Sequence, residues 1–245
     1  MSVLADLADP HVEETLTEHI VPARPLIPED PPAGNYVVID VTHFSTTVVE
    51  LFVEGAEYVH VTEERGDEHA FKADHPRAKI GGGSVGERRP EEGYDFFNSP
   101  SSVHRTDVAG RPVAMTSTNG GASVTDLRKA GDDVDVYVGG LTNAAAVADH
   151  LAEAPRPTYL VGAGSDGTAS PEDVVGALVI GRRLFGEPPT PTEREVYRQV
   201  VYNAKAPKYR RQSEVRVTDL EEYDLAFNER SVVPRLDGQK LYDVA

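Results

Sequence analysis

Along most of the chain, short apolar runs alternate with segments in which apolar residues recur at helical spacing. The apolar runs predict buried strands at residues 37–41, 58–61, 112–115, 134–138 and 159–161. The helical spacing predicts helices at residues 45–53, 121–129, 143–152 and 171–185. Repeated strand–helix units are typical of α/β proteins, in which helices pack on a largely parallel sheet.

Some segments interrupt this pattern. Residues 1–34 are acidic and end in the sequence VPARPLIPEDPPAG, whose prolines exclude a regular helix or a central strand. We therefore predict an N-terminal acidic arm over residues 1–34 and a single α/β domain over residues 35–245. Two segments of the domain are rich in turn residues and are predicted to be irregular, namely 81–102 and 188–211. A short strand is expected at residues 225–228.

Composition narrows the choice of partners and compartment. The chain has 41 acidic and 24 basic residues, a formal net charge of −17, and no cysteine. Because binding to nucleic acid or to an anionic membrane surface needs a basic patch, we expect neither partner. Without cysteine there are no disulfides or thiolate ligands, and no apolar run is long enough to span a membrane. We expect a cytoplasmic protein, and the many acids with only six lysines are typical of adaptation to high salt.

Polar residues cluster after four of the predicted strands. The carboxyl ends of parallel strands lie at one edge of a sheet, so these loops are expected to converge on a binding site. The first loop, DVTHFSTT, offers Asp40 as a Mg²⁺ ligand and the hydroxyls of Thr46 and Thr47 as phosphate ligands at a helix start. Alternatively, these groups only cap the helix and a turn. A single histidine such as His43 is more often structural than catalytic.

The loop before the last long predicted helix carries three carboxylates, on Asp166, Glu172 and Asp173. They are candidate ligands of a metal or of the attacking water. Alternatively, the sequence SPED at 170–173 is only a helix start, with an N-cap serine, a proline at the first position and acids that suit the helix dipole. The preceding GAGSDG matches GxGxxG, but no strand ending in an acid follows about twenty residues later, so no dinucleotide cofactor is expected.

Three further polar groups follow predicted strands or aromatic residues. The turn TSTNGG is either a capped tight turn or an anion cradle of backbone N–H groups, formed by Thr118, Asn119 and Gly120. The segment GYDFFNSP sets three polar residues beside two phenylalanines, namely Asp95, Asn98 and Ser99. Asn143 follows the fourth predicted strand. The motifs of zinc hydrolases, serine hydrolases and P-loop kinases are absent from the sequence.

Taken in order, these segments resemble those of the 2-phosphosulfolactate phosphatase family, Mg²⁺-dependent enzymes associated with coenzyme M biosynthesis. The segments that carry the resemblance are DVTHFSTTVVELFVEGAEYV, GYDFFNSPSSV, TSTNGG, LTNAAAVADHL, VGAGSDGTASPEDVVGA and DLAFNERSVVPRLDG. They extend over most of the chain, from about residue 37 to residue 237. The resemblance implies a three-layer α/β sandwich with a mostly parallel or mixed central sheet.

The resemblance also implies that the protein is a phosphatase, which uses Mg²⁺ to hydrolyse a small phosphorylated hydroxy acid. It further suggests that the protein is a homo-oligomer. We expect the metal or the attacking water to be handled by Asp40, Asp166, Glu172 and Asp173, with Asp40 and Asp173 as the metal ligands. We expect the small anionic substrate to be held by His43, Thr46, Thr47, Asp95, Asn98, Ser99, Thr118, Asn119, Gly120 and Asn143. Arginines that could face this substrate include Arg88, Arg105 and Arg210.

The first loop departs from the family pattern. The chain has Thr42 and His43 where the family typically has Leu-Arg, so a bidentate clamp for an oxyanion is missing there. An alternative hypothesis is therefore a catalytically altered member that binds small anions or forms oligomers. In a third hypothesis the protein is still a hydrolase, but its substrate is an unrelated ester.

Overall fold

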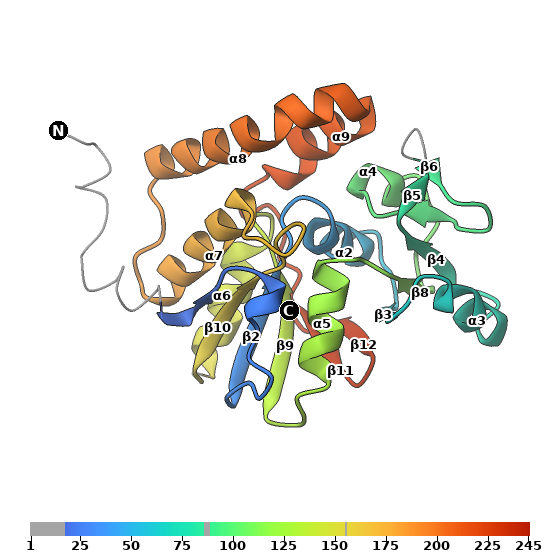
Figure 1. Cartoon of the computed structure of the whole chain (residues 1–245), viewed down its shortest axis with the longest axis horizontal. Helices are drawn as coiled ribbons and strands as arrows, with labels where there is room; N and C mark the ends of the chain where they lie inside the picture. The colour runs from blue at the N-terminus through green and yellow to red at the C-terminus, as the bar shows by residue number, and fades with distance from the viewer. Residues whose placement is uncertain (1–17, 86–88, 155) are drawn as a thin grey trace.

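The computed structural model describes residues 18–85, 89–154 and 156–245. Within this part of the chain the main sheet has ten strands in the order β1-β10-β2-β9-β11-β12-β3-β8-β4-β7 (Figure 1). The strands are β1 (Ile20–Val21), β2 (Gly34–Ile39), β3 (Tyr58–Val61), β4 (Lys79–Gly82), β7 (Phe96–Phe97), β8 (Pro112–Met115), β9 (Val134–Gly139), β10 (Thr158–Gly162), β11 (Pro234–Asp237) and β12 (Lys240–Asp243). A separate small ribbon pairs β5 (Ser84–Val85) with β6 (Arg89–Pro90).

Helices connect most of these strands. They are α2 (Phe44–Val53), α3 (Asp67–Asp74), α4 (Pro100–Val103), α5 (Gly120–Arg128), α6 (Ala144–Glu153), α7 (Pro171–Leu184), α8 (Pro191–Gln212) and α9 (Glu214–Thr218). A 3₁₀ turn lies at Arg24–Leu26, and a π-helical turn at Asp219–Asp224 follows α9. The predicted α/β sandwich with a mixed, mostly parallel sheet is confirmed.

An antiparallel hairpin divides the sheet into two parallel blocks. Strands β11 and β12 pair with each other, and they pair antiparallel with β9 on one side and with β3 on the other. The block β1-β10-β2-β9 therefore runs opposite to the block β3-β8-β4-β7. Helix α5 packs against β2, β9 and β3 and so contacts both blocks, and its first residue, Gly120, after β8, meets Asp40 at the end of β2.

Strand β2 is buried on both faces, and each face belongs to a different apolar cluster. Val37 and Ile39 pack in a cluster with residues of α6, α7 and α8. Tyr36 and Val38, which point the opposite way, pack in a cluster with residues of α2, α5, β3 and β8. This double burial explains why β2 appears in the sequence as a continuous apolar run rather than as an alternating one.

Two local predictions are wrong. Most of the segment 188–211, predicted to be irregular, is the long helix α8. Its proline-rich start is a helix N-terminus, in which Thr190 is the N-cap and Pro191 the first helical residue. Residues 225–228, predicted as a strand, form a turn after the π-helical segment instead.

The predicted arm lies only partly within the described residues. Residues 1–17 lie outside them, while Ile20–Val21 pairs with β10 at the edge of the sheet. In the described part of the chain, no helix has the length and apolar character that a membrane crossing requires.

Candidate functional site

A cavity of about 310 Å³ lies where the loops after β2, β8 and β10 meet helix α8, which crosses above these strand ends in Figure 1. We call it the carboxylate cavity. It is lined by Asp40, Thr42, His43, Asn98, Ser117, Thr118, Asn119, Gly164, Ser165, Glu172, Lys205, Lys208, Tyr209 and Gln212. Three of the four loops that were expected to converge therefore meet at this cavity. The loop after β7, which carries Asn98, joins them.

Asp40 is held at the end of β2 by the backbone of another loop. Its Oδ2 accepts a hydrogen bond of 3.0 Å from the N–H of Gly120, which begins α5. A Cβ at position 120 would lie 2.8 Å from this oxygen and 2.5 Å from Cδ1 of Phe44, so only glycine permits the contact. Burial, with a smaller contribution from the nearby Glu172 carboxylate, raises the pKa of Asp40 to about 7, although the Gly120 hydrogen bond and the neighbouring cations act to lower it.

The two neighbouring acids of α7 occupy different positions. Asp173 accepts hydrogen bonds of 2.9 Å from the N–H groups of Val41 and Gly164, one on each oxygen, and so ties the loops after β2 and β10 together. Glu172 faces the carboxylate cavity, where its Oε1 forms an ion pair with Lys205 and lies 3.5 Å from Oγ1 of Thr42. Its Oε2 is buried and has no hydrogen-bond partner. Of the two, Glu172 has the oxygen available to a ligand.

His43 connects the first loop to α8 and α9. Its backbone has φ of 131°, a strained conformation for a residue with a side chain. Arg216 of α9 donates to Nδ1 of His43 over 2.8 Å, which leaves the ring proton on Nε2, 3.3 Å from the hydroxyl of Tyr209. Because both ring nitrogens are engaged in this way, the imidazole acts as a positioning group between two other side chains.

Arg216 brings a buried cation to the same loop. Its side chain is 5% exposed, donates to the carbonyl oxygen of Asn98 over 3.0 Å and lies over the ring of Phe97. The carboxylate of Asp219 lies 3.5 Å away and is itself held by the backbone and hydroxyl of Ser101. A guanidinium therefore stands beside His43, the position at which the family pattern has arginine.

Six of the residues predicted to form the site line the carboxylate cavity, namely Asp40, His43, Asn98, Thr118, Asn119 and Glu172. Gly120 is adjacent and contributes its N–H to Asp40. Several of the lining residues were not predicted, chiefly Lys205, Lys208, Tyr209 and Gln212 of α8. Their spacing of i, i+3, i+4 and i+7 is that of one helix face, but the prolines at the start of the segment 188–211 predict an irregular segment instead.

The other predicted residues are held away from the cavity. Thr46 donates to the carbonyl oxygen of Val41 over 2.7 Å, and Thr47 is fully buried in α2. The side chain of Asn143 forms hydrogen bonds with backbone groups of β9 and of the loop that follows it. Ser99 is the N-cap of α4.

Two acids and the predicted arginines also lie elsewhere. Asp95 is paired with Lys72 and Lys79, which together with the Ile80 N–H hold its pKa below the ordinary value although burial opposes this. Asp166 is exposed on its loop. Arg105 and Arg210 are exposed and do not line the carboxylate cavity, and Arg88 lies outside the described residues.

The carboxylate cavity offers few side chains that could hold a metal ion. Among the described residues, no group of three or more His, Asp or Glu side chains forms a metal cage. Mg²⁺ typically takes only one or two carboxylates and completes its shell with water and phosphate oxygens. Asp40 and Glu172 both line the cavity, and Oε2 of Glu172 has no hydrogen-bond partner, so these are the two carboxylates that could hold such an ion.

Two acids beside lysines and hydroxyls at the strand ends of an α/β sheet form a site suited to a small anionic ester, as in α/β phosphatases. Comparison with known families agrees with this class. The model of the 2-phosphosulpholactate phosphatase family matches residues 23–224. The chain therefore belongs to the 2-phosphosulfolactate phosphatase family.

Similar proteins include three named probable 2-phosphosulfolactate phosphatase. That of Synechococcus sp. (strain CC9605) is 34% identical over 174 residues, which are 69% of this chain and 68% of the relative. That of Deinococcus radiodurans is 36% identical over 161 residues, 65% of each chain. That of Gloeobacter violaceus is 33% identical over 162 residues, 66% of this chain and 67% of the relative. The chain thus spans about two thirds of the length of the curated relatives that it matches.

Proposed function

We propose that this protein is a Mg²⁺-dependent phosphatase that hydrolyses a small phosphorylated hydroxy acid resembling 2-phosphosulfolactate, releasing sulfolactate and phosphate. The observation that carries the proposal is the carboxylate cavity, in which Asp40 and Glu172 face the same small space as Lys205 and Lys208. Phosphoryl transfer needs its negative charge neutralised and its reactants aligned more than it needs covalent help from the protein.

Each group of side chains has a distinct role in this proposal. Asp40 and Glu172 would hold the cation, which supplies positive charge to the phosphoryl oxygens and orients them. Lys205 and Lys208 neutralise the remaining charge of the phosphate, and the hydroxyls of Ser117 and Thr118 orient it. Helix α8 covers the strand ends and so limits the access of bulk water to the reaction.

Backbone hydrogen bonds fix the positions of the carboxylates that would hold the cation. The Gly120 N–H sets the orientation of Asp40, and Asp173 locks the loop that precedes Glu172 against the loop that follows Asp40. Such pre-orientation avoids the cost of rearranging the site when the substrate binds. Asp173, predicted as a metal ligand, would therefore act on the cation only through the positions of these loops.

The test is phosphate release from 2-phosphosulfolactate, with Mg²⁺ or with a chelator, in molar KCl. We expect Mg²⁺-dependent release by the natural sequence and a loss of at least about 100-fold in kcat/KM for Glu172→Gln, more than the loss typical of groups that only support a metal ligand. The matched control is Asp166→Asn, which changes an exposed acid of the loop before α7 and should retain activity.

Three results would overturn the proposal or part of it. Release equal to the blank without enzyme would overturn catalysis and favour a protein that only binds small anions. Release that is unchanged by chelation would overturn the role of the cation. Full activity of Glu172→Gln would overturn the assignment of the carboxylates.

A further inference from the structure

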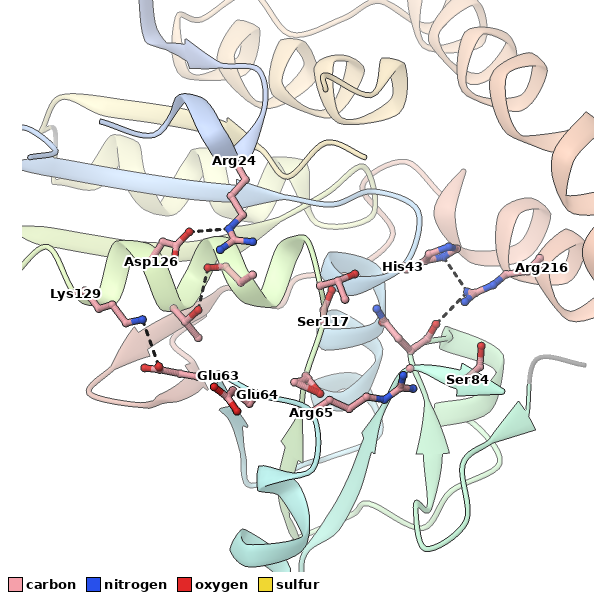
Figure 2. A pocket seen from close by; sticks show the side chains of 16 residues that line it. Arg24, His43, Glu63, Glu64, Arg65, Ser84, Ser117, Asp126, Lys129 and Arg216 are labelled. Carbon is pink, nitrogen blue, oxygen red and sulfur yellow. Dashed lines mark hydrogen bonds and ion pairs between the residues drawn. The ribbon is translucent and has the colours of Figure 1, made fainter. Parts of the chain in front are cut away.

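A second cavity of about 620 Å³ continues from the first one. His43, Asn98, Ser117 and Thr118 line both, so a small ligand can extend from one into the other. We call the second one the arginine cavity, because Arg65 and Arg216 lie at the end where the two meet. Figure 2 shows these two side chains reaching toward the same space from opposite sides, near Ser84 and Ser117.

The charges of the arginine cavity are arranged unevenly. At its outer end each cation is paired with an acid that also lines the cavity: Arg24 lies 2.7 Å from Asp126, and Lys129 lies 3.3 Å from Glu63. In Figure 2 Glu63 and Glu64 lie toward Lys129, whereas the guanidinium of Arg65 extends away from them. Arg65 and Arg216 at the inner end also pair with acids, Glu91 and Asp219, but neither acid lines the cavity, so the lining there is cationic.

Arg65 is placed by a glycine and by an acid outside the lining. Its Nη2 forms an ion pair of 2.7 Å with Glu91, which does not line the cavity. The guanidinium lies directly on Gly83, where a Cβ would come within 2.1 Å of Nη2. Glycine at position 83 thus leaves room for the cation on the wall of the cavity.

From this geometry we propose that the inner end of the arginine cavity binds the sulfonate of the substrate, an acid group that is not transferred, and that Arg65 is the residue that selects it. The inference rests on the proposed function and assigns a part of the substrate to a part of the site. The phosphate lies in the carboxylate cavity, and the substrate spans the four shared residues. A planar guanidinium with several N–H groups matches the tetrahedral oxygens of a sulfonate better than a lysine would.

The experiment compares two substrates that differ only in the sulfonate, 2-phosphosulfolactate and 2-phospholactate. The measured quantity is the ratio of their kcat/KM values. We expect Arg65→Gln to reduce this ratio by about ten- to a hundredfold, since the loss of one charge-assisted contact changes affinity on that scale. A purely structural role would lower both values together and leave the ratio unchanged.

A second variant tests the position of the guanidinium rather than its charge. Gly83 has no positive φ, so alanine is compatible with its backbone, and the added methyl group meets only the flexible end of Arg65. Gly83→Ala should therefore reduce the ratio in the same direction while the protein stays folded. The matched control is Arg24→Gln at the outer end of the same cavity, which should retain the ratio.

Binding of sulfolactate, measured by calorimetry, separates this inference from the proposed function because it needs no turnover. Weaker binding to Arg65→Gln and to Gly83→Ala than to the natural sequence supports the sulfonate subsite even if no phosphate is released. Equal binding to all variants, or an unchanged ratio of kcat/KM, overturns it. A ratio that falls equally in Arg24→Gln overturns the selective role of Arg65.

Discussion

Single residues at the strand ends determine which side chains can meet in the site. Asp40 approaches α5 only because residue 120 is glycine, and Arg65 reaches the cavity wall only because residue 83 is glycine. Arg216 comes from α9, far along the chain, and contacts His43 in the first loop. The guanidinium that the first loop lacks is thus supplied in space by another element, which argues against a loss of anion binding.

Glu68 gives a prediction about stability and pH. It is fully buried and accepts hydrogen bonds from the hydroxyls of Thr62, Thr116 and Tyr94 and from the Gly66 N–H. Burial acts to raise the pKa of Glu68, but the hydroxyl and amide hydrogen bonds outweigh it and hold this pKa below the ordinary value of 4.5. A lowered pKa in the folded state stabilises the fold above pH 4.5, and this stabilisation is lost as the pH falls through the folded-state value.

We therefore expect Glu68→Gln to lower the free energy of unfolding at neutral pH by about 2 kcal/mol, because buried hydrogen bonds to a charged group are lost. The difference from the natural sequence should shrink as the pH falls below the ordinary glutamate pKa. Urea unfolding at several pH values measures both effects. Glu187→Gln, a substitution of an exposed acid, is the control. A difference that grows in acid would contradict the prediction.

The sequence was sufficient to find those site residues that directly follow a strand, but not those that depend on tertiary contacts. Asp40 lies at the end of a predicted strand, Asn119 follows the next one but one, and both line the cavity. Asp173 resembles Glu172 in sequence, yet only Glu172 faces the cavity, because adjacent residues of a helix point about 100° apart. Arg216 lies about 170 positions from its partner His43, and no local pattern encodes such a contact.

At the scale of elements, the N-terminus of α8 contains a complete capping box. The hydroxyl of Thr190 accepts from the Glu193 N–H over 3.3 Å, and the Glu193 carboxylate accepts from the Thr190 N–H over 2.7 Å. Glu193 also forms an ion pair with Arg182 of α7, so the cap joins two helices. This cap fixes the start of the helix that carries Lys205 and Tyr209 across the site.

We expect Thr190→Ala to lower the free energy of unfolding by about 1 kcal/mol, the usual cost of losing an N-cap side chain. Thr192→Ala is the matched control, because Thr192 is exposed in the same turn and does not cap the helix. Chemical denaturation measures both variants, and amide exchange of the first turn of α8 shows whether the loss is local. Equal destabilisation by the two substitutions would contradict the role of the cap.

The same helix shows where prediction of the fold succeeded and failed. The βα units were placed to within a few residues because their apolar runs are buried on both faces and their helices end at glycine or polar residues. Helix α8 was missed because its prolines and charges suggest a loop, although TPTE at residues 190–193 is itself a capping signal. The hairpin of β11 and β12 lies between distant strands, and its short strands carry no information about these neighbours.

At the scale of the whole molecule, the net charge of −17 is concentrated near the N-terminus, since residues 1–75 contain 16 acidic and three basic residues. Repulsion among like charges destabilises a compact state, and salt screens it. The site does not share this excess of negative charge, because α8 and α9 contribute cationic side chains to it. A protein with a strongly negative surface can in this way bind a small anion.

We expect the unfolding temperature to rise by several degrees as KCl increases from about 0.1 M to about 2 M, because salt screens the repulsion among the surface acids. Salt also strengthens apolar burial, so the increase alone does not identify its cause. A variant with four exposed, unpaired acids replaced by their amides separates the two effects. The replaced acids are Glu29, Asp30, Glu57 and Asp132.

If repulsion dominates, this variant is more stable than the natural sequence at low salt and gains less on addition of KCl, since fewer charges remain to be screened. If apolar burial dominates, the two proteins gain equally, because the substitutions leave the buried clusters intact. Thermal unfolding of both proteins across the same KCl series therefore decides the matter. Parallel curves would show that the acidic surface does not limit the stability of this fold.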